Sequence, residues 1–402
     1  MSYSVQNIRN VCLLGHSGSG KTSLAESLLF MTGAIDRMGR VADGNTVCDY
    51  DPEEVKRQIS LSTAVAPIDY KGCRINVLDT PGAFDFSGEV MEALRAADAA
   101  IIVCSAKDGV SVGLEKAWKY CEERNMPRFI YISKTDEDNS DYNATFEALR
   151  ARFGNKIAPL VVPIWDEGKK VTGIIDVLNK RAYEMQDQKR VEIEIPEGKD
   201  AVIEEFNNAL KESVAETSEE FMDRYFNGEE FSEDEIRQAL RVNVAEGSIV
   251  PVLMGSNILA RGMYTLMVDI VKYLPSPEKR ECTGINAKTN EVYPANYDFA
   301  KPKSAYVFKT IVDPFIGKYS FIKVCSGVLK GDDTLYNADT DTDEKLGKIY
   351  TMFGNKPVEV SELFAGDIGA IAKLTATRTG DTLSTKTTPV LYGKTEYSKP
   401  YT

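Results

Sequence analysis

Short apolar runs alternate with helical patterns over the first two thirds of the chain. The runs VCLLG, INVLD, AAIIVCSA, RFIYIS and IVPVLMG are typical of buried strands, and segments such as SLAESLLFM and VGLEKAWKYCEER have helical spacing. Strands that alternate with helices form a parallel sheet covered by helices. The pattern therefore predicts an α/β domain that occupies residues 1–280.

The stretch of chain before IVPVLMG is longer than a connection between two strands of this sheet requires. It contains PLVVPIWDEGKKVTGIIDVLNKRAYEM and then acidic helical segments, so we expect an inserted α+β subdomain at about residues 157–250. Two helix starts carry the capping-box spacing, Thr217 with Glu220 and Ser232 with Glu235. The acid-rich run around them is either a solvated helical face or a docking face for a basic partner.

The pattern changes after the sequence YLPSP. Pro275 and Pro277 stop a helix there, and we expect a polar loop as far as about Pro302. Short β-branched or aromatic runs then recur about every 8–12 residues between Gly and Asp turns. This spacing predicts an antiparallel β-barrel within residues 281–402, with no element of its own in the tail TPVLYGKTEYSKPYT.

Charge and cysteine content restrict the class of protein. The 48 Lys and Arg against 61 Asp and Glu give a net charge of −13, which argues against coating nucleic acid by bulk charge. The seven cysteines are dispersed without a C-x-x-C pair, so they indicate neither a disulfide framework nor a zinc site. No signal-type or membrane-length apolar run is present. We expect a monomeric, cytoplasmic protein with no DNA or membrane partner.

Residues 15–22 read GHSGSGKT, follow a predicted strand and open a predicted helix, which is the context of a phosphate-binding P-loop. Glycines let backbone N–H groups approach phosphates, the lysine neutralises β- and γ-phosphate oxygens, and the threonine hydroxyl ligates Mg²⁺. The residues expected to contact the nucleotide here are Gly15, His16, Ser17, Gly18, Ser19, Gly20, Lys21, Thr22 and Ser23.

The tetrapeptide Asp79-Thr80-Pro81-Gly82 ends a second buried strand. By itself it is an ordinary turn, but paired with the P-loop it indicates a γ-phosphate sensor. An aspartate there can hold Mg²⁺ through water, and the Gly82 N–H can reach the γ-phosphate.

Two further strand ends carry candidate base-binding residues. Ser133, Lys134 and Asp136 follow RFIYIS, and a carboxylate at 136 accepts two hydrogen bonds that guanine offers and adenine does not. Ser256 and Asn257 follow IVPVLMG and could present a backbone N–H to the base. Because ligands bind at the carboxyl ends of strands in open α/β sheets, these residues predict GTP rather than ATP as the nucleotide.

The motifs, in this order, resemble elongation factor G and its paralogues, the translational GTPases. Four further segments share the resemblance: YLPSP, DPFIGKYSFIKVCSGVLKGDDTLYN, AGDIGAI and TGDTL. The resemblance covers essentially the whole chain. It implies a GTP-binding domain, an insert beside the base-binding region, and a barrel that docks on the small ribosomal subunit. Ribosomal RNA and proteins would then be the partners, and Lys318, Lys323 and Lys330 on expected exposed strands are candidate contacts.

The family normally has three more domains, so we expect this chain to be the N-terminal two-domain portion of a longer factor. The family also usually has His directly after DTPG, where it orients the hydrolytic water, whereas this chain has Ala83. A methyl group cannot hydrogen-bond water, so catalysis would depend on Lys21, Mg²⁺ and the Gly82 N–H and would be weak. His16, the only histidine, matches a P-loop His of the family that is not the catalytic one.

Other departures are milder. Gly18 stands where the family commonly has Asp, Ser133 replaces the usual Asn, and Asn257 replaces the usual Ala. KRQISL matches the family segment RGITI, so the resemblance implies Ser60 as a Mg²⁺ ligand. Gln58 replaces the Gly of that segment, and one hypothesis is that it takes over the orientation of water.

Two functions remain open from the sequence. The first is a ribosome-dependent GTPase that acts in translocation or a related remodelling step. The second is a ribosome-binding GTP switch that scarcely hydrolyses its nucleotide. A third reading, an ATP-driven P-loop enzyme, is opposed by Asp136.

Overall fold

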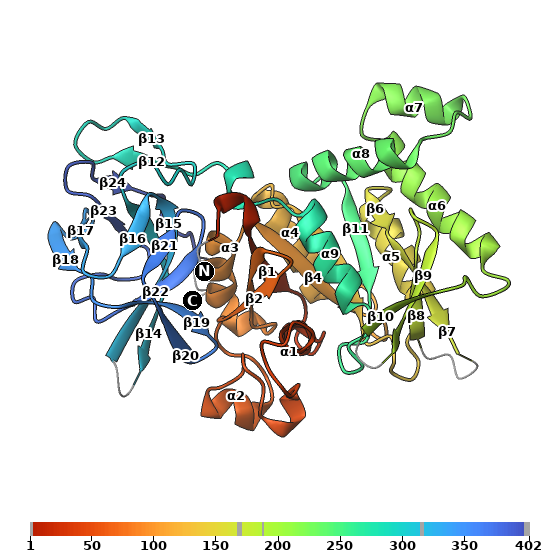
Figure 1. Ribbon diagram of the computed structural model, residues 1–402, viewed down its shortest axis with the longest axis horizontal. Helices are drawn as coiled ribbons and strands as arrows, with labels where there is room; N and C mark the ends of the chain where they lie inside the picture. The colour runs from red at the N-terminus through yellow and green to blue at the C-terminus, as the bar shows by residue number, and fades with distance from the viewer. Residues whose placement is uncertain (1–2, 167–170, 187–188, 314–316, 398–402) are drawn as a thin grey trace.

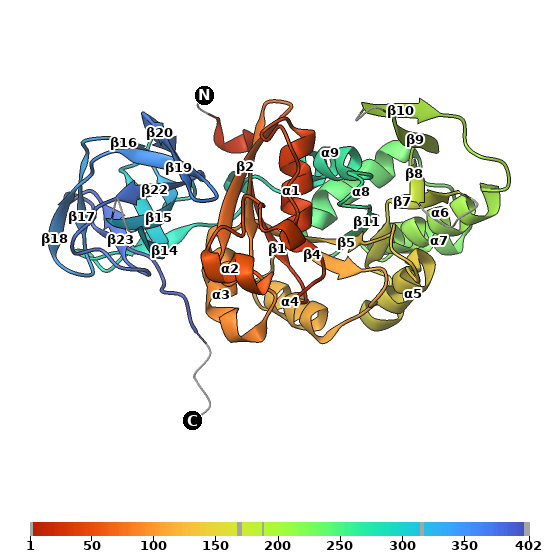
Figure 2. The same ribbon diagram turned by 90° about the horizontal axis from the view of Figure 1, so that it is seen from below.

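The computed structural model describes residues 3–166, 171–186, 189–313 and 317–397. Figures 1 and 2 show an elongated molecule with a β-rich domain at one end, an α/β domain in the middle and a smaller α+β unit at the other end. Among the described residues, no helix has the length and apolar character that crossing a bilayer requires.

The central domain is built on a seven-stranded sheet with the order β2-β3-β1-β4-β5-β11-β6. All neighbours are parallel except β2 and β3, and the core strands are buried along nearly their whole length, as in a sheet covered on both faces. The five strands expected from sequence are present. The strands are β1 (Ile8–Leu14), β2 (Ala64–Tyr70), β3 (Cys73–Asp79), β4 (Ala99–Ser105), β5 (Arg128–Ser133), β6 (Ile157–Pro159) and β11 (Val250–Met254).

Helices flank this sheet, and the short helix α2 lies apart from it (Figure 1). The α-helices are α1 (Lys21–Met31), α2 (Pro52–Arg57), α3 (Ser87–Ala96), α4 (Val112–Glu123), α5 (Tyr142–Phe153) and α9 (Met263–Tyr273), with short 3-10 turns η1 (Val5–Asn7), η2 (Val41–Asp43), η3 (Phe84–Phe86) and η4 (Pro277–Lys279).

The α+β unit lies between β6 and β11 in sequence. An antiparallel sheet, β10-β9-β8-β7, lies there with three helices, of which α6 contacts β7 and the other two pack on α6. Its elements are β7 (Val161–Trp165), β8 (Val171–Asp176), β9 (Arg181–Gln186), β10 (Lys189–Ile193), α6 (Asp200–Ala215), α7 (Glu219–Phe226) and α8 (Glu233–Glu246). β6 itself pairs with β11 and so belongs to the central sheet.

Of the two expected capping boxes, one is confirmed and one is wrong. Ser232 and Glu235 cap α8 reciprocally. At α7 the cap is Ser218, whose hydroxyl accepts from the Phe221 N–H. Thr217 lies one residue before this cap, and its hydroxyl donates to the Val214 carbonyl at the end of the preceding helix, at 2.7 Å.

The β-rich domain contains an eight-stranded antiparallel sheet with the order β18-β17-β23-β14-β15-β22-β19-β20 and a separate β16-β21 pair. The expected fold class, a P-loop α/β domain with an insert followed by an antiparallel β domain, is confirmed. The strands are β14 (Ser304–Asp313), β15 (Gly317–Ser326), β16 (Val328–Lys330), β17 (Thr334–Asn337), β18 (Thr342–Lys345), β19 (Ile349–Phe353), β20 (Lys356–Val360), β21 (Glu362–Phe364), β22 (Ile368–Ala372) and β23 (Thr382–Ser384).

The linker and the tail are more ordered than expected. β12 (Thr283–Asn286) pairs with β13 (Val292–Pro294) within the expected loop and with β24 (Val390–Leu391) from the expected unstructured tail. The Tyr392 hydroxyl then lies 2.7 Å from the Ser304 hydroxyl. Neither segment has a strong strand pattern of its own. Each is stabilised as a strand by pairing with the other, about a hundred residues away in the chain.

The expectation that three lysines line an exposed ribosome contact is wrong for Lys323. Its side chain is 4% exposed and forms an ion pair with Asp98 of the central domain, whose side chain is 2% exposed. Lys318 is half-buried and donates to the Thr377 carbonyl at 2.7 Å. Lys330 is exposed and pairs with Glu362. The strand that carries Lys323 therefore faces the domain junction and not solvent.

Candidate functional site

The predicted site residues gather at one edge of the central sheet. The P-loop follows β1, the DTPG turn follows β3, and the two candidate base-binding loops follow β5 and β11. These strands are parallel and lie within five consecutive positions of the sheet, so their carboxyl ends meet at the same edge.

The P-loop glycines have the backbone conformations that their type allows. Gly15, Gly18 and Gly20 have φ angles of +141°, +76° and +97°, and no atom lies within 4 Å of where a Gly18 side chain would begin. The Lys21 side chain folds into the loop and donates to the carbonyls of Gly15 at 3.0 Å and His16 at 2.8 Å. The His16 side chain is exposed, with its ring centre 6.2 Å from that of Phe84.

A cavity of about 480 Å³ lies against the P-loop, large enough for a small-molecule ligand. Of the base-binding candidates, Lys134 lines it, whereas Ser133, Asp136, Ser256 and Asn257 lie outside its lining. The predicted residues that it brings together are Ser17, Gly18, Gly20, Lys21, Thr22, Ser23, Gln58, Ser60, Gly82 and Lys134.

Thr22, Ser60 and Asp49 line this cavity, and the buried Asp79 lies directly behind Thr22. The Thr22 hydroxyl donates to Asp79 Oδ2 at 2.7 Å and lies 3.0 Å from the Ser60 hydroxyl. Asp79 Oδ1 and both carboxylate oxygens of Asp49 are buried, and within the described residues they have no hydrogen-bond partner. Buried oxygen atoms without a hydrogen-bond partner are suitable ligands for a hard divalent cation. Mg²⁺ would therefore be held by Thr22, Ser60, Asp79 and Asp49.

The shifted pKa values of the charged groups in this cluster also favour a bound cation. Burial, assisted by repulsion from Asp49, raises the pKa of Asp79 to about 7, and burial also raises the pKa of Asp49. Burial lowers the pKa of Lys21 to about 8, although both carboxylates act in the opposite direction. Two neighbouring buried carboxylates with unpaired oxygens are unfavourable until a cation compensates them.

Asp49 was missed by the sequence analysis. It lies in TVCDYD, ahead of α2, and its only signal is an acidic residue among apolar ones in the segment that precedes Ser60. Its place beside Asp79 depends on how residues 41–63, the first switch segment, fold back over the P-loop. Glu26 of α1 contributes to that fold by accepting from the N–H groups of Gly39 and Val47.

Within the first switch segment, α2 begins after a capping box formed by Asp51 and Glu54 and ends at Arg57, with Gln58 as its C-cap. Gln58 has a left-handed φ of +55°, and its side-chain amide donates to the Ala42 carbonyl at 3.1 Å. The amide therefore contacts the switch backbone, and Ser60, two residues later, faces Thr22.

The second switch segment, residues 79–86, lies directly on the P-loop. The Thr80 hydroxyl donates to the Leu13 carbonyl at 2.5 Å, next to the buried Pro81. A side chain on Gly82 would begin 2.5 Å from the Ser17 nitrogen and 2.6 Å from Lys21 Nζ, so only glycine fits.

Ala83 differs sharply from its neighbour Gly82. It is half-buried, has ordinary extended backbone angles (φ −77°, ψ 138°), and lines a separate small cavity with Phe84, Lys116 and Tyr120. Its methyl group cannot position a water molecule by hydrogen bonding.

The loops after β5 and β11 contact the P-loop from the other side. The Ser133 hydroxyl lies 2.6 Å from the Ser19 carbonyl, and Lys134 has a left-handed φ of +58°. The Ser256 N–H is already used within its own loop, because it donates to the Arg261 carbonyl. Asp136 is half-buried, and the buried Asn257 side chain turns toward the P-loop.

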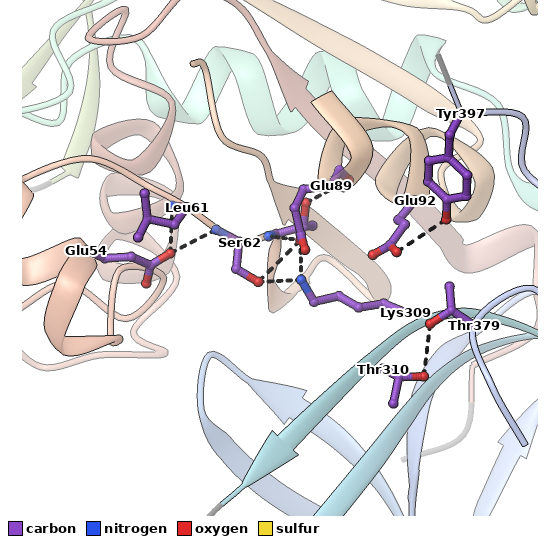
Figure 3. A network of polar contacts seen from close by, with 10 residues as sticks. Glu54, Leu61, Ser62, Glu89, Glu92, Lys309, Thr310, Thr379 and Tyr397 are labelled. Atoms are coloured by element: carbon purple, nitrogen blue, oxygen red, sulfur yellow. Dashed lines mark hydrogen bonds and ion pairs between the residues drawn. The ribbon is translucent and has the colours of Figure 1, made fainter. Parts of the chain in front are cut away.

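The β domain reaches the first switch segment, and the helix that follows the second, through Lys309 of β14. Its ammonium donates to the Ser62 hydroxyl and forms an ion pair with Glu89 of α3 (Figure 3). Glu89 also accepts from the Thr63 N–H at 2.7 Å. Rearrangement of either switch would therefore alter the junction between the two domains.

Comparisons with known proteins agree with this geometry. The family model for the elongation factor Tu GTP binding domain matches residues 6–276, and the model for elongation factor G domain 2 matches residues 302–386. A crystal structure of a protein from Thermus thermophilus is similar over 98% of this chain, with 34% sequence identity and a TM-score of 0.83. The chain spans 55% of that protein.

The first of these matches covers more than half of the 402 residues, and the second extends it through the β domain. The chain therefore belongs to the elongation factor G-like translational GTPases.

Proposed function

We propose that this chain binds GTP with Mg²⁺ and acts on the ribosome as the N-terminal part of an elongation factor G-type GTPase, in translocation or a related remodelling step. The observation that carries the proposal is that Lys21, Thr22 and Ser60 line one cavity, with the buried Asp79 bonded to Thr22 directly behind it. The GTP-binding domain would be residues 1–280 with its insert at about 157–250, and the β domain would be residues 281–402. We expect it to be monomeric and cytoplasmic.

In the proposed mechanism the residues act mainly by position and charge. The P-loop N–H groups and Lys21 would bind the phosphates, and Thr22, Ser60, Asp79 and Asp49 would hold Mg²⁺, which neutralises charge that develops on the phosphate oxygens. Lys21 now contacts the carbonyls of Gly15 and His16, so it would exchange these contacts for phosphate oxygens on binding. The N–H of Gly82 would approach the γ-phosphate.

Base recognition would come from the loop after β5. Asp136 would accept two hydrogen bonds from guanine, with the Lys134 stem packed on the base and the Asn257 N–H directed at the base oxygen. Asp136→Ala should lower GTP affinity by about 10²-fold, because charge-assisted hydrogen bonds are lost, and leave the weak binding of ATP nearly unchanged. Competition of unlabelled GTP and ATP against a fluorescent GDP analogue measures both.

The second candidate function is a GTP switch with little or no hydrolysis, and Ala83 is the observation that favours it. The loss of a water-orienting group typically costs about 10²–10⁴-fold in rate. An active GTPase would need another group, from the ribosome or from its own backbone, to orient the water.

Single-turnover GTP hydrolysis with purified ribosomes, compared between the natural chain and Ala83→His, tests the two candidates. Similar rates in both would favour the ribosome-dependent GTPase. Turnover in the variant alone would favour the switch. If neither binds GTP more tightly than ATP, the proposed function is wrong.

A further inference from the structure

Asn257 uses both ends of its side-chain amide. Nδ2 donates to the Gly20 carbonyl of the P-loop at 2.9 Å, and Oδ1 accepts from the Tyr131 hydroxyl at 2.9 Å. Asn257 is 5% exposed and Tyr131 is fully buried on β5. The amide is therefore held in one orientation between the sheet and the P-loop.

Ser133 approaches the same stretch of backbone from the neighbouring loop. Its hydroxyl lies 2.6 Å from the Ser19 carbonyl and 3.2 Å from the Cys104 carbonyl, and a hydroxyl has only one proton to donate. A side chain on Gly20 would begin 3.1 Å from Asn257 Nδ2 and 3.7 Å from Ser133 Oγ. The two side chains thus lie together over Gly20, and between them they bind two consecutive P-loop carbonyls.

The bound carbonyl has a structural role of its own. The Gly20 oxygen accepts the first helical hydrogen bond of α1, from the Leu24 N–H at 2.9 Å, and Gly20 directly precedes Lys21. A contact that fixes Gly20 therefore fixes the start of the helix whose first two side chains would meet phosphate and Mg²⁺.

We propose that Asn257 is a positioning residue that joins the loop after β11 to the P-loop and thereby slows the release of bound nucleotide, with Ser133 as its partner. The inference rests on the proposed GTP binding. Both contacts meet at the backbone that leads into α1, so the loops after β5 and β11 hold the same stretch of the P-loop.

The test measures the release of a fluorescent GDP analogue by stopped flow in the presence of Mg²⁺. Asn257→Ala leaves the Gly20 carbonyl and the Tyr131 hydroxyl without this partner, and it should speed release about 5–10-fold, as expected for one buried hydrogen-bonding group. Ser133→Asn in that background restores an amide in the vacated space and should return release to within about twofold of the natural rate. Ser133→Asn by itself crowds Asn257 and should not slow release.

Two further variants separate positioning from general destabilisation. Tyr131→Phe should speed release by itself but add nothing to Asn257→Ala, because both act through the same amide. Ile258→Ala, at the next position of the loop and 49% exposed, should leave release unchanged. Thermal melting without nucleotide checks that each variant is folded.

The result that overturns the inference is a folded Asn257→Ala protein with the natural release rate, or a double variant no slower than Asn257→Ala. Either would leave the proposed function intact, since the natural chain would still bind the analogue. If the natural chain does not bind the analogue at all, the proposed function and this inference both fail.

Discussion

Lys309 of β14 and Glu89 of α3 form an ion pair across the junction between the β domain and the GTP-binding domain. The lysine side chain is 2% exposed and the glutamate side chain 28%. Because Glu89 also accepts from the Thr63 N–H, one carboxylate joins the end of the first switch segment, the helix after the second, and the β domain (Figure 3).

Lys309→Met should destabilise the protein by about 1–3 kcal/mol, because it leaves Glu89 in a half-buried place without its cation. Urea unfolding measures the change. Lys348→Met is the matched control, since Lys348 pairs with Glu359 where both side chains are more than half exposed, and it should change stability by less than about 0.5 kcal/mol. Equal changes in the free energy of unfolding would mean that the ion pair at the junction contributes no more than an exposed one.

Glu92, one turn further along α3, makes the junction sensitive to pH. Burial, and then repulsion from Glu89, raises the pKa of Glu92 to about 7, while Lys309 and the Tyr397 hydroxyl oppose the rise. A raised carboxyl pKa means that the folded protein retains a proton that the unfolded chain releases. The stability from this group is therefore complete below pH 4.5 and is lost as the pH rises to about 7.

Glu92→Gln, which imitates the protonated acid, should therefore be more stable than the natural chain at pH 8 by about 1–2 kcal/mol, after allowance for partial exposure, and nearly equal to it at about pH 4.5. Unfolding in urea at the two pH values measures the difference. Glu204→Gln, on the exposed side of α6, should show no such dependence. A difference between Glu92→Gln and the natural chain that does not vary with pH would contradict the assignment.

Asp49 should affect nucleotide binding and stability in opposite directions. Asp49→Asn should raise the Mg²⁺ concentration needed for tight GDP binding by about tenfold or more, as expected for a residue that orients a metal site. It should also raise the melting temperature of the nucleotide-free protein at pH 8, because it removes one of two neighbouring buried carboxylates. Asp43→Asn, exposed in the same segment, should do neither. A loss of stability together with unchanged Mg²⁺ dependence would place Asp49 outside the site.

Gln58→Ala should leave the rate of single-turnover hydrolysis on ribosomes unchanged, because the Gln58 amide is bound to the Ala42 carbonyl. The same variant should release nucleotide about 2-fold faster, since one exposed hydrogen bond across the first switch segment is lost. A loss of hydrolysis of about 10²-fold or more would instead show that Gln58 moves to orient the water.

The strand-ending motifs could be predicted from sequence because each depends on local chemistry. Glycines at 15, 18 and 20 adopt the backbone angles that the P-loop pattern requires, and five apolar runs became five strands of the central sheet. Contacts between distant segments could not be predicted. Lys323 has the pattern of an exposed strand lysine, and only the pairing with Asp98, 225 residues away, buries it.

The strand in the C-terminal tail could not be predicted for the same reason. β24 has two residues, and its partner β12 lies more than a hundred residues earlier, so neither segment has a pattern long enough to detect. Asp49 and Asn257 are likewise ordinary residues in sequence, and their roles arise from the loops that fold against the P-loop.

The contrast between Gly82 and Ala83 has a consequence for how such a protein can diverge. Any side chain at 82 would collide with the phosphate-binding backbone, whereas the residue at 83 has ordinary angles and borders a cavity. A substitution at 82 would therefore disturb the P-loop backbone itself, whereas one at 83 can leave that backbone in place. If hydrolysis depends on the residue at 83, one copy of a duplicated gene could lose rapid turnover there and keep its nucleotide pocket.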